Sequence, residues 1–295
     1  MTFIQEPTDY TFNASALGVG GYFVRDGKKV LVPSLASVAL APGGGEGWSR
    51  VTNYDQDDIS FTHAESRVAG YATSPRRFTT YSDILITNLS VWSTFQVAML
   101  HATVTSTRDL DSDDEAQFHL QATYRGVEVD GCEIIPELDI DICHASRYQA
   151  LAEAETALLD SRRAATTEQV EALARRRKAM QRGEPIRTTL LRDLQKGRRG
   201  EHLGKAGRNV LVVPNFASVH FGELLVKPGR RRVNLLRFDF GTRLPAFAEG
   251  DIAGFAAEGS DTVLTEFATR ALSQNSGTLA VGSGDGNGDP VWPRG

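Results

Sequence analysis

Apolar and polar residues alternate with a period of two over most of this chain, on both sides of one central stretch. The alternating segments are rich in Thr, Val, Ile and aromatic residues and are separated by turns that contain glycine, which is typical of β-strands. The sequence predicts strands within 17–40 and at 59–71, 76–81, 83–91, 93–107, 117–124, 127–130, 137–143, 210–226 and 231–240. These segments together predict a mainly β protein.

The segment 93–107 indicates how the strands are layered. Phe95, Val97 and Met99 alternate with Gln96, Ala98 and Leu100, so both faces of this strand are largely apolar. A strand with two apolar faces is covered on both sides, as in a sandwich or a closed barrel. Near the other end of the chain, Pro228-Gly229 lies between two alternating segments and predicts a type II turn within a β-hairpin.

The stretch 146–208 breaks this pattern. Ala, Glu, Arg, Leu and Gln dominate it, with no glycine before Gly183 and no proline before Pro185. Ser146 is a suitable N-cap, and Thr166-Thr-Glu-Gln169 matches a capping box. We therefore expect a charged α-helical insert, as one long helix or a helical hairpin, followed by a basic return loop.

These segments define the expected fold. We expect one β-sandwich or barrel-like domain built jointly by residues 1–145 and 209–272, interrupted by the helical, basic insert 146–208. The glycine-rich end, 273–295, is expected to be a flexible tail. The two flanks of the insert would then share one hydrophobic interior.

Charge is unevenly distributed along the chain. The net charge is −5, yet residues 162–208 contain fourteen Lys and Arg against five Asp and Glu. The positive charge of the insert would suit binding to a polyanion, contact with a protein partner, or packing against the acidic remainder of the chain.

Neither the cysteines nor the N-terminal segment indicates a secreted protein. Cys132 and Cys143 are too few for a disulfide framework, and the sequence leaves open whether they are bridged. No basic start followed by an apolar core is visible, and no apolar run is long enough to span a bilayer. The default expectation is a soluble, cytoplasmic protein.

Several short segments resemble a known group of proteins. Asn88-Leu-Ser-Val91, the strand end at 103–107, the segment 124–131 and Val213-Pro-Asn-Phe-Ala-Ser-Val219 are similar to uncharacterised bacterial all-β surface proteins of the choice-of-anchor P type. The resemblance covers about a third of the chain, within 68–129 and 213–240. It implies a β-sandwich-like fold and association with the cell surface, and it implies no catalytic residue.

An acidic strand face is the first candidate site. Glu137, Asp139 and Asp141 alternate with apolar residues, so their carboxylates would project from one face about 7 Å apart. That spacing suits a hard cation such as Ca²⁺, or an acid and a base on either side of a sugar bond. A plain solvated face, or one covered by the arginines of the insert, explains the pattern equally, and we expect no cofactor.

Two histidines could complete such a site. His101 and His119 lie on strands that are expected to pair, so the fold could bring them close to Asp139 and Asp141. This arrangement would define a carbohydrate- or ester-acting hydrolase. Each histidine could equally be an ordinary strand residue with a local partner.

The insert supplies the other candidates. Leu151, Leu158, Val170 and Leu173 form an apolar stripe at helical spacing, and Arg175, Arg176 and Arg177 surround the predicted helix with positive charge. The leading hypothesis is a non-enzymatic structural or interaction protein whose insert mediates self-association or contact with a protein partner. The alternatives are the hydrolase and a protein that binds a polyanion, such as nucleic acid, through its basic insert.

Overall fold

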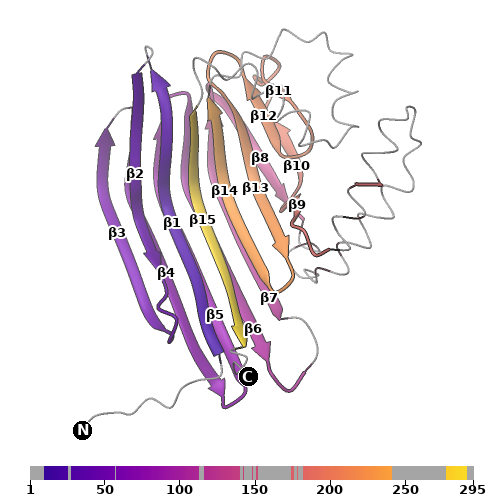
Figure 1. Ribbon diagram of the computed structural model, residues 1–295. Helices are drawn as coiled ribbons and strands as arrows, with labels where there is room; N and C mark the ends of the chain where they lie inside the picture. Colours follow the sequence, from indigo (N-terminus) through magenta and orange to yellow (C-terminus); the bar gives the residue numbers. More distant parts are fainter. Residues whose placement is uncertain are drawn as a thin grey trace.

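The computed structural model describes residues 10–25, 28–56, 58–112, 116–139, 182–240 and 277–290, together with the single positions 142, 148, 151, 174, 175 and 178. These residues form two antiparallel β-sheets that lie face to face (Figure 1). Within the described part of the chain, no helix has the length and the apolar composition needed to cross a membrane.

Sheet A joins strands from both ends of the chain. Its main path runs in the order β11-β12-β13-β14-β15-β1-β2. β9 also pairs with β13, on the same edge as β12 but further along the strand. The strands are β1 (Tyr10–Arg25), β2 (Lys28–Ala39), β9 (Ile186–Thr189), β11 (Gly204–Lys205), β12 (Val210–Val213), β13 (Ala217–Lys227), β14 (Arg230–Phe240) and β15 (Gly277–Pro290).

Sheet B is a meander with one added strand. Its order is β10-β8-β7-β6-β5-β4-β3, so six consecutive strands lie side by side and β10 joins at the β8 edge. The strands are β3 (Gly45–Gln56), β4 (Ile59–Ser74), β5 (Arg77–Val91), β6 (Phe95–Asp109), β7 (Gln117–Val129), β8 (Cys132–Leu138) and β10 (Leu191–Lys196).

The core lies between the two sheets. One large cluster of buried apolar residues combines side chains from both sides of the segment 146–208, among them Phe23, Phe95, Phe221 and Phe238. A smaller cluster around Tyr10, Phe12 and Phe78 closes one end, with the rings of Tyr10 and Phe78 stacked 4.3 Å apart. The two flanking stretches therefore share one hydrophobic interior.

In each sheet, the regular pairing is interrupted at one residue in each of five neighbouring strands. These residues form a row across the strands, which we call the crease. In sheet B the regular pairing skips a residue at each of Asn53, Thr62, Asn88, Ala98 and Gly126, and in sheet A at Gly18, Ala36, Gly222, Leu235 and Gly282. Alternate strands carry a left-handed residue in this row, such as Asn88 (φ 52°) and Gly126 (φ 60°). Glycine and asparagine tolerate this conformation best.

The crease shifts the alternation of side chains by one residue. On β6, Phe95 and Val97 point into the core before the crease, and Leu100 and Val104 do so after it, while Met99 is only half-buried. The prediction that this strand is covered on both faces is therefore wrong. It has one core face, which changes phase at Ala98.

The expected helical insert is not seen. No continuous helix occurs among the described residues, and three strands, β9, β10 and β11, occupy part of the range 146–208 that was expected to be helix and return loop. Leu190 and Leu191 are fully buried between the sheets, so this part of the chain belongs to the sandwich itself. Most of 146–181 lies outside the described residues.

The glycine-rich end forms a central strand, which corrects the prediction of a flexible tail. β15, drawn in yellow in Figure 1, lies between β14 and β1 and pairs with both along its length. The Asp285 carboxylate is 3% exposed, accepts hydrogen bonds from the Ser15 amide and hydroxyl at 2.8 and 2.7 Å, and forms an ion pair with Arg230.

The glycines of β15 allow the sheets to approach closely. A Cβ added at Gly284 would lie 2.9 Å from Ile84 Cδ1 and 3.1 Å from Ser82 Oγ, both on the opposite sheet. A Cβ at Gly277 would meet the backbone of Tyr22 and Phe23 on β1. Glycine inside a strand commonly marks such a close approach.

Candidate functional site

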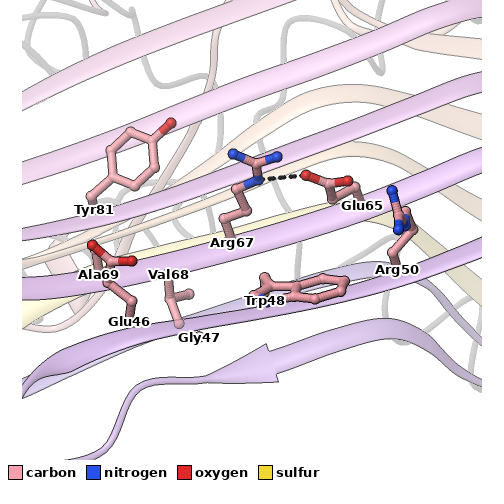
Figure 2. Close-up of a pocket in the computed structure, with 9 residues that line it drawn as sticks. All are labelled: Glu46, Gly47, Trp48, Arg50, Glu65, Arg67, Val68, Ala69 and Tyr81. Carbon is pink, nitrogen blue, oxygen red and sulfur yellow. Dashed lines mark hydrogen bonds and ion pairs between the residues drawn. The ribbon is translucent and has the colours of Figure 1, made fainter.

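A groove lies on the outer face of sheet B, near its β3 edge. Its volume is about 520 Å³, and it is lined by Glu46, Gly47, Trp48, Arg50, Glu65, Arg67, Val68, Ala69 and Tyr81 (Figure 2). The register of three strands assembles it: Trp48 on β3 faces Arg67 on β4, and Ala69 on β4 faces Tyr81 on β5. We call these nine residues the Trp48 groove.

An exposed indole ring is the main apolar element of the groove. Trp48 is 65% exposed on a regular strand, and the guanidinium of Arg50 lies 5.5 Å from the centroid of its ring. A cation at this distance from an aromatic face is attracted to it. Because both residues project from β3 two positions apart, the strand fixes their relative position.

Charged side chains of both signs flank this ring. Arg67 donates a hydrogen bond from Nε to Glu65, and Figure 2 shows Arg67 between Tyr81 and Glu65, with the Trp48 ring next to the pair. The hydrogen bond to Glu65 and its negative charge raise the pKa of Arg67. With two arginines and two glutamates, the lining of the groove is electrically balanced.

Asp83 anchors the side of the groove that Tyr81 forms. Its Oδ1 atom lies 2.8 Å from His101 Nε2 and accepts a hydrogen bond from the Thr103 hydroxyl at 2.9 Å. Burial, together with the charge of Asp83 and a hydrogen bond to it, raises the pKa of Tyr81. The shift extends the pH range over which the phenol stays protonated. The bonds of Asp83 to His101 and Thr103 also join β5 to β6 beside the groove.

A second charged cluster lies on the outer face of sheet A. His220 and Glu223 project from β13, and Arg237 and Asp239 project from the neighbouring strand β14. Arg237 Nε and Nη2 donate to the two Glu223 oxygens at 2.9 and 2.8 Å, while Nη1 donates to Asp239. His220 Nε2 lies 3.0 Å from Asp239 Oδ2. We call these four residues the sheet A ion network.

The carboxylates of this network are held in their charged form. Burial opposes ionisation of Glu223, but the hydrogen bonds and charge of Arg237 outweigh it and lower the pKa. For Asp239 burial is likewise outweighed, first by the hydrogen bond with His220 and then by the charge of Arg237. The pKa of Arg237 is raised by its two carboxylate partners, against the effect of burial.

The acidic strand face is only partly present. β8 ends at Leu138, and the Asp139 amide donates to the Leu190 carbonyl at 2.7 Å. The Asp139 carboxylate accepts a hydrogen bond from the Ile142 amide at 3.3 Å and lies 3.9 Å from Arg208, and Glu137 accepts one from Gln195. Asp141 lies outside the described residues, and among those described no group of metal-ligating side chains could hold a metal ion.

The two predicted histidines are not brought together. His101 faces Thr123, whereas His119 faces Thr105, four residues further along β6. That separation is about 13 Å at the rise of a strand. His101 is paired with Asp83, and His119 Nε2 lies 3.0 Å from Gln121 Nε2. The register of β6 and β7 therefore keeps these two histidines apart.

Few candidates of the insert can be placed. Leu151 packs against a buried cluster that contains Tyr148 and Ile186, so it contributes to the fold, and Arg175 is exposed. Leu158, Val170, Leu173, Arg176 and Arg177 lie outside the described residues. Cys132 is a buried thiol that contacts the Gly197 carbonyl, while Cys143 is also outside the described residues.

Both charged regions were missed by sequence reasoning. Their side chains come from two or three strands, and the register that brings them together is not visible in any single segment. One signal was available: Trp48 follows a glycine-rich loop and stands between Glu46 and Arg50, which places an aromatic residue and two opposite charges on one strand face.

The comparisons with known proteins identify the family. A family model described as a domain of unknown function, DUF8256, matches residues 10–227. This chain belongs to that family. The match includes β1 to β13 and the whole Trp48 groove, and it ends before β14 and β15. No curated protein and no solved structure matches the chain significantly.

Proposed function

We propose that this protein is a non-enzymatic binding protein that takes a carbohydrate chain in the Trp48 groove. The observation that carries the proposal is the Trp48 ring, which is 65% exposed on β3 and bordered by the ion pair of Arg67 and Glu65. Binding sites commonly combine an apolar or aromatic surface with a few placed polar groups, in a volume of about 300–1,000 Å³.

The chemistry of the lining favours a neutral, polyhydroxylated ligand. The flat indole offers an apolar surface to the C–H face of a sugar ring, and carboxylate and guanidinium groups are strong acceptors and donors for hydroxyls. The balanced charge of Glu46, Glu65, Arg50 and Arg67 gives no net attraction for a polyanion. The open position on a sheet face also suits a chain that extends beyond the groove.

A binding role fits this groove better than catalysis. Glycoside hydrolysis requires one carboxyl group that donates a proton and a second that acts as base or nucleophile. Glu65 already accepts a hydrogen bond from Arg67, so one of its oxygens is occupied. The hydrolase built on Asp139 and Asp141 remains a hypothesis without support from the described residues.

Affinity electrophoresis against a panel of soluble polysaccharides tests the proposal. We expect at least one neutral polysaccharide to retard the protein, and Trp48→Ala to weaken that binding by about tenfold or more, as for an aromatic residue at the centre of a site. Leu31→Ala is the matched control, because Leu31 is 70% exposed on β2 and lies outside the groove.

Two outcomes would count against the proposal. In the first, no neutral polysaccharide binds, or Trp48→Ala binds as tightly as the unmodified protein. In the second, the protein is retained on heparin with an affinity that falls steeply with salt, which would favour polyanion binding instead.

A further inference from the structure

The strand β3 ends sheet B with one side unpaired. It pairs with β4 from Gly45 to Gln56, and no other described strand pairs with it. Figure 1 shows it at the outer edge of the sandwich. An edge strand presents a row of free backbone N–H and C=O groups, to which another chain can add a strand.

The other long edges carry features that oppose such pairing. At β10, Lys205 Nζ donates to the Leu194 carbonyl and to Asp193, so a lysine occupies part of that edge. At the sheet A edge, β2 contains Pro33, next to an irregularity in its pairing with β1. Lysine, proline and bulges are recognised means of blocking an edge. β3 contains neither lysine nor proline.

The outer face of β3 is self-complementary. Glu46, Trp48 and Arg50 follow one another on this face, two residues apart. If two copies of β3 pair antiparallel about Trp48, each Glu46 lies opposite an Arg50 of the other copy and the two Trp48 rings lie opposite each other. Such an interface is isologous, as in a twofold dimer.

We propose that this chain forms a twofold dimer by antiparallel pairing of β3 with β3 of a second copy, centred on Trp48. The regular part of β3 fits this centre, because it begins at Gly45 and the crease interrupts it at Asn53. Opposite residues of an antiparallel pair lie about 5 Å apart, within reach of an ion pair between long side chains.

The charges of β3 are available for this contact. Among the described residues, Glu46 is paired with no cation and Arg50 with no carboxylate, and Arg50 only lies over the Trp48 ring. Other charges on the same face are already engaged, Glu65 with Arg67 and Asp83 with His101. Strand addition leaves the outer face open, so the two Trp48 grooves would form one continuous surface.

Sedimentation velocity over a wide concentration series, without any carbohydrate, tests the dimer. We expect a monomer–dimer equilibrium in the unmodified protein. Glu46→Arg and Arg50→Glu should each weaken it by about tenfold or more, because like charges then face each other. The double variant with both changes restores opposite charges, so it should regain dimerisation.

Arg232→Glu is the control, since Arg232 is exposed on sheet A, away from β3. A protein that stays monomeric at every concentration would overturn the dimer, and so would a dimer unaffected by either single charge reversal. Failure of the double variant to recover, while circular dichroism shows it folded, would overturn the register. None of these outcomes depends on carbohydrate binding, which the Trp48→Ala experiment measures separately.

Discussion

The outer faces of the two sheets carry similar charged side chains in two different arrangements. In the sheet A ion network, Arg237 is paired with both Glu223 and Asp239, Asp239 also contacts His220, and the four side chains are only 17–26% exposed. In the Trp48 groove, Arg67 is 62% exposed, Glu46 and Arg50 form no ion pair with described residues, and an aromatic ring faces solvent. The first arrangement stabilises the fold, and the second leaves polar and aromatic groups available to a ligand.

Removing one arginine from each region should separate these roles most clearly. Arg237→Met leaves Glu223 and Asp239 close together and half-buried without their shared cation, and should lower the free energy of unfolding by about 2–3 kcal/mol. Arg67→Met, in the groove, should cost less, no more than about 1 kcal/mol, because Arg67 is 62% exposed. Urea denaturation of both variants measures this, and equal losses would remove the distinction between the regions.

Acidification should weaken the sheet A ion network. The folded pKa values of Glu223 and Asp239 lie below their unfolded values of about 4.3 and 3.9. Their contribution is therefore present above pH about 4 and is lost as the pH falls through the folded pKa values.

Urea midpoints measured from neutral pH to about pH 2 should therefore fall at the acidic end. In Glu223→Gln this fall should be smaller, because one of the two titrating groups is gone. An identical acid profile for this variant and the unmodified protein would show that other carboxylates dominate.

Asp83 is intermediate between the two regions, because it links β5 to β6 and also contacts Tyr81, which lines the groove. Asp83→Asn weakens its interactions with His101, Thr103 and Tyr81 and should cost about 1 kcal/mol of stability. It should also reduce carbohydrate affinity by loosening Tyr81. Calorimetry and affinity electrophoresis on the same variant check both effects. Reduced stability with unchanged affinity would show that Tyr81 does not contribute to binding.

The smallest effect on stability is expected at Trp48 itself. Because its ring is exposed, Trp48→Ala should change the free energy of unfolding by no more than about 0.5 kcal/mol. The exposed Leu31→Ala should behave alike in the same urea titration. A large loss for Trp48→Ala alone would mean that the ring supports the fold, and that any loss of binding has a structural cause.

The sequence predicted the parts of the fold that depend on local chemistry. The hairpin at Pro228-Gly229 is confirmed: Lys227 pairs with Arg230 and Gly229 has a φ of 65°. The alternation of apolar and polar residues also predicted most of the strands of sheet B, from β4 to β7. Two sheets stacked face to face agree with the predicted sandwich, whereas the predicted helical insert is wrong in the part that the structure describes.

The errors have physical causes. β15 was read as a tail because its glycines normally indicate flexibility, whereas here they let the backbone of β1 and the side chains of sheet B approach. The crease reverses the alternation within a strand, so Met99 and Leu100 suggested two apolar faces. The Trp48 groove depends on the register of β3, β4 and β5, which no local pattern specifies.

The position of β15 has a consequence for how the chain folds. Ala14 pairs with Gly286, so sheet A cannot be completed until residues from opposite ends of the sequence have met. Contacts this distant in sequence slow folding, because a long stretch of chain must be ordered first. During synthesis on the ribosome, β1 and β14 would each present an open edge until the last strand emerged. We therefore expect newly made chains to rely on chaperones, and truncation before Gly277 to give insoluble protein even though sheet B is intact.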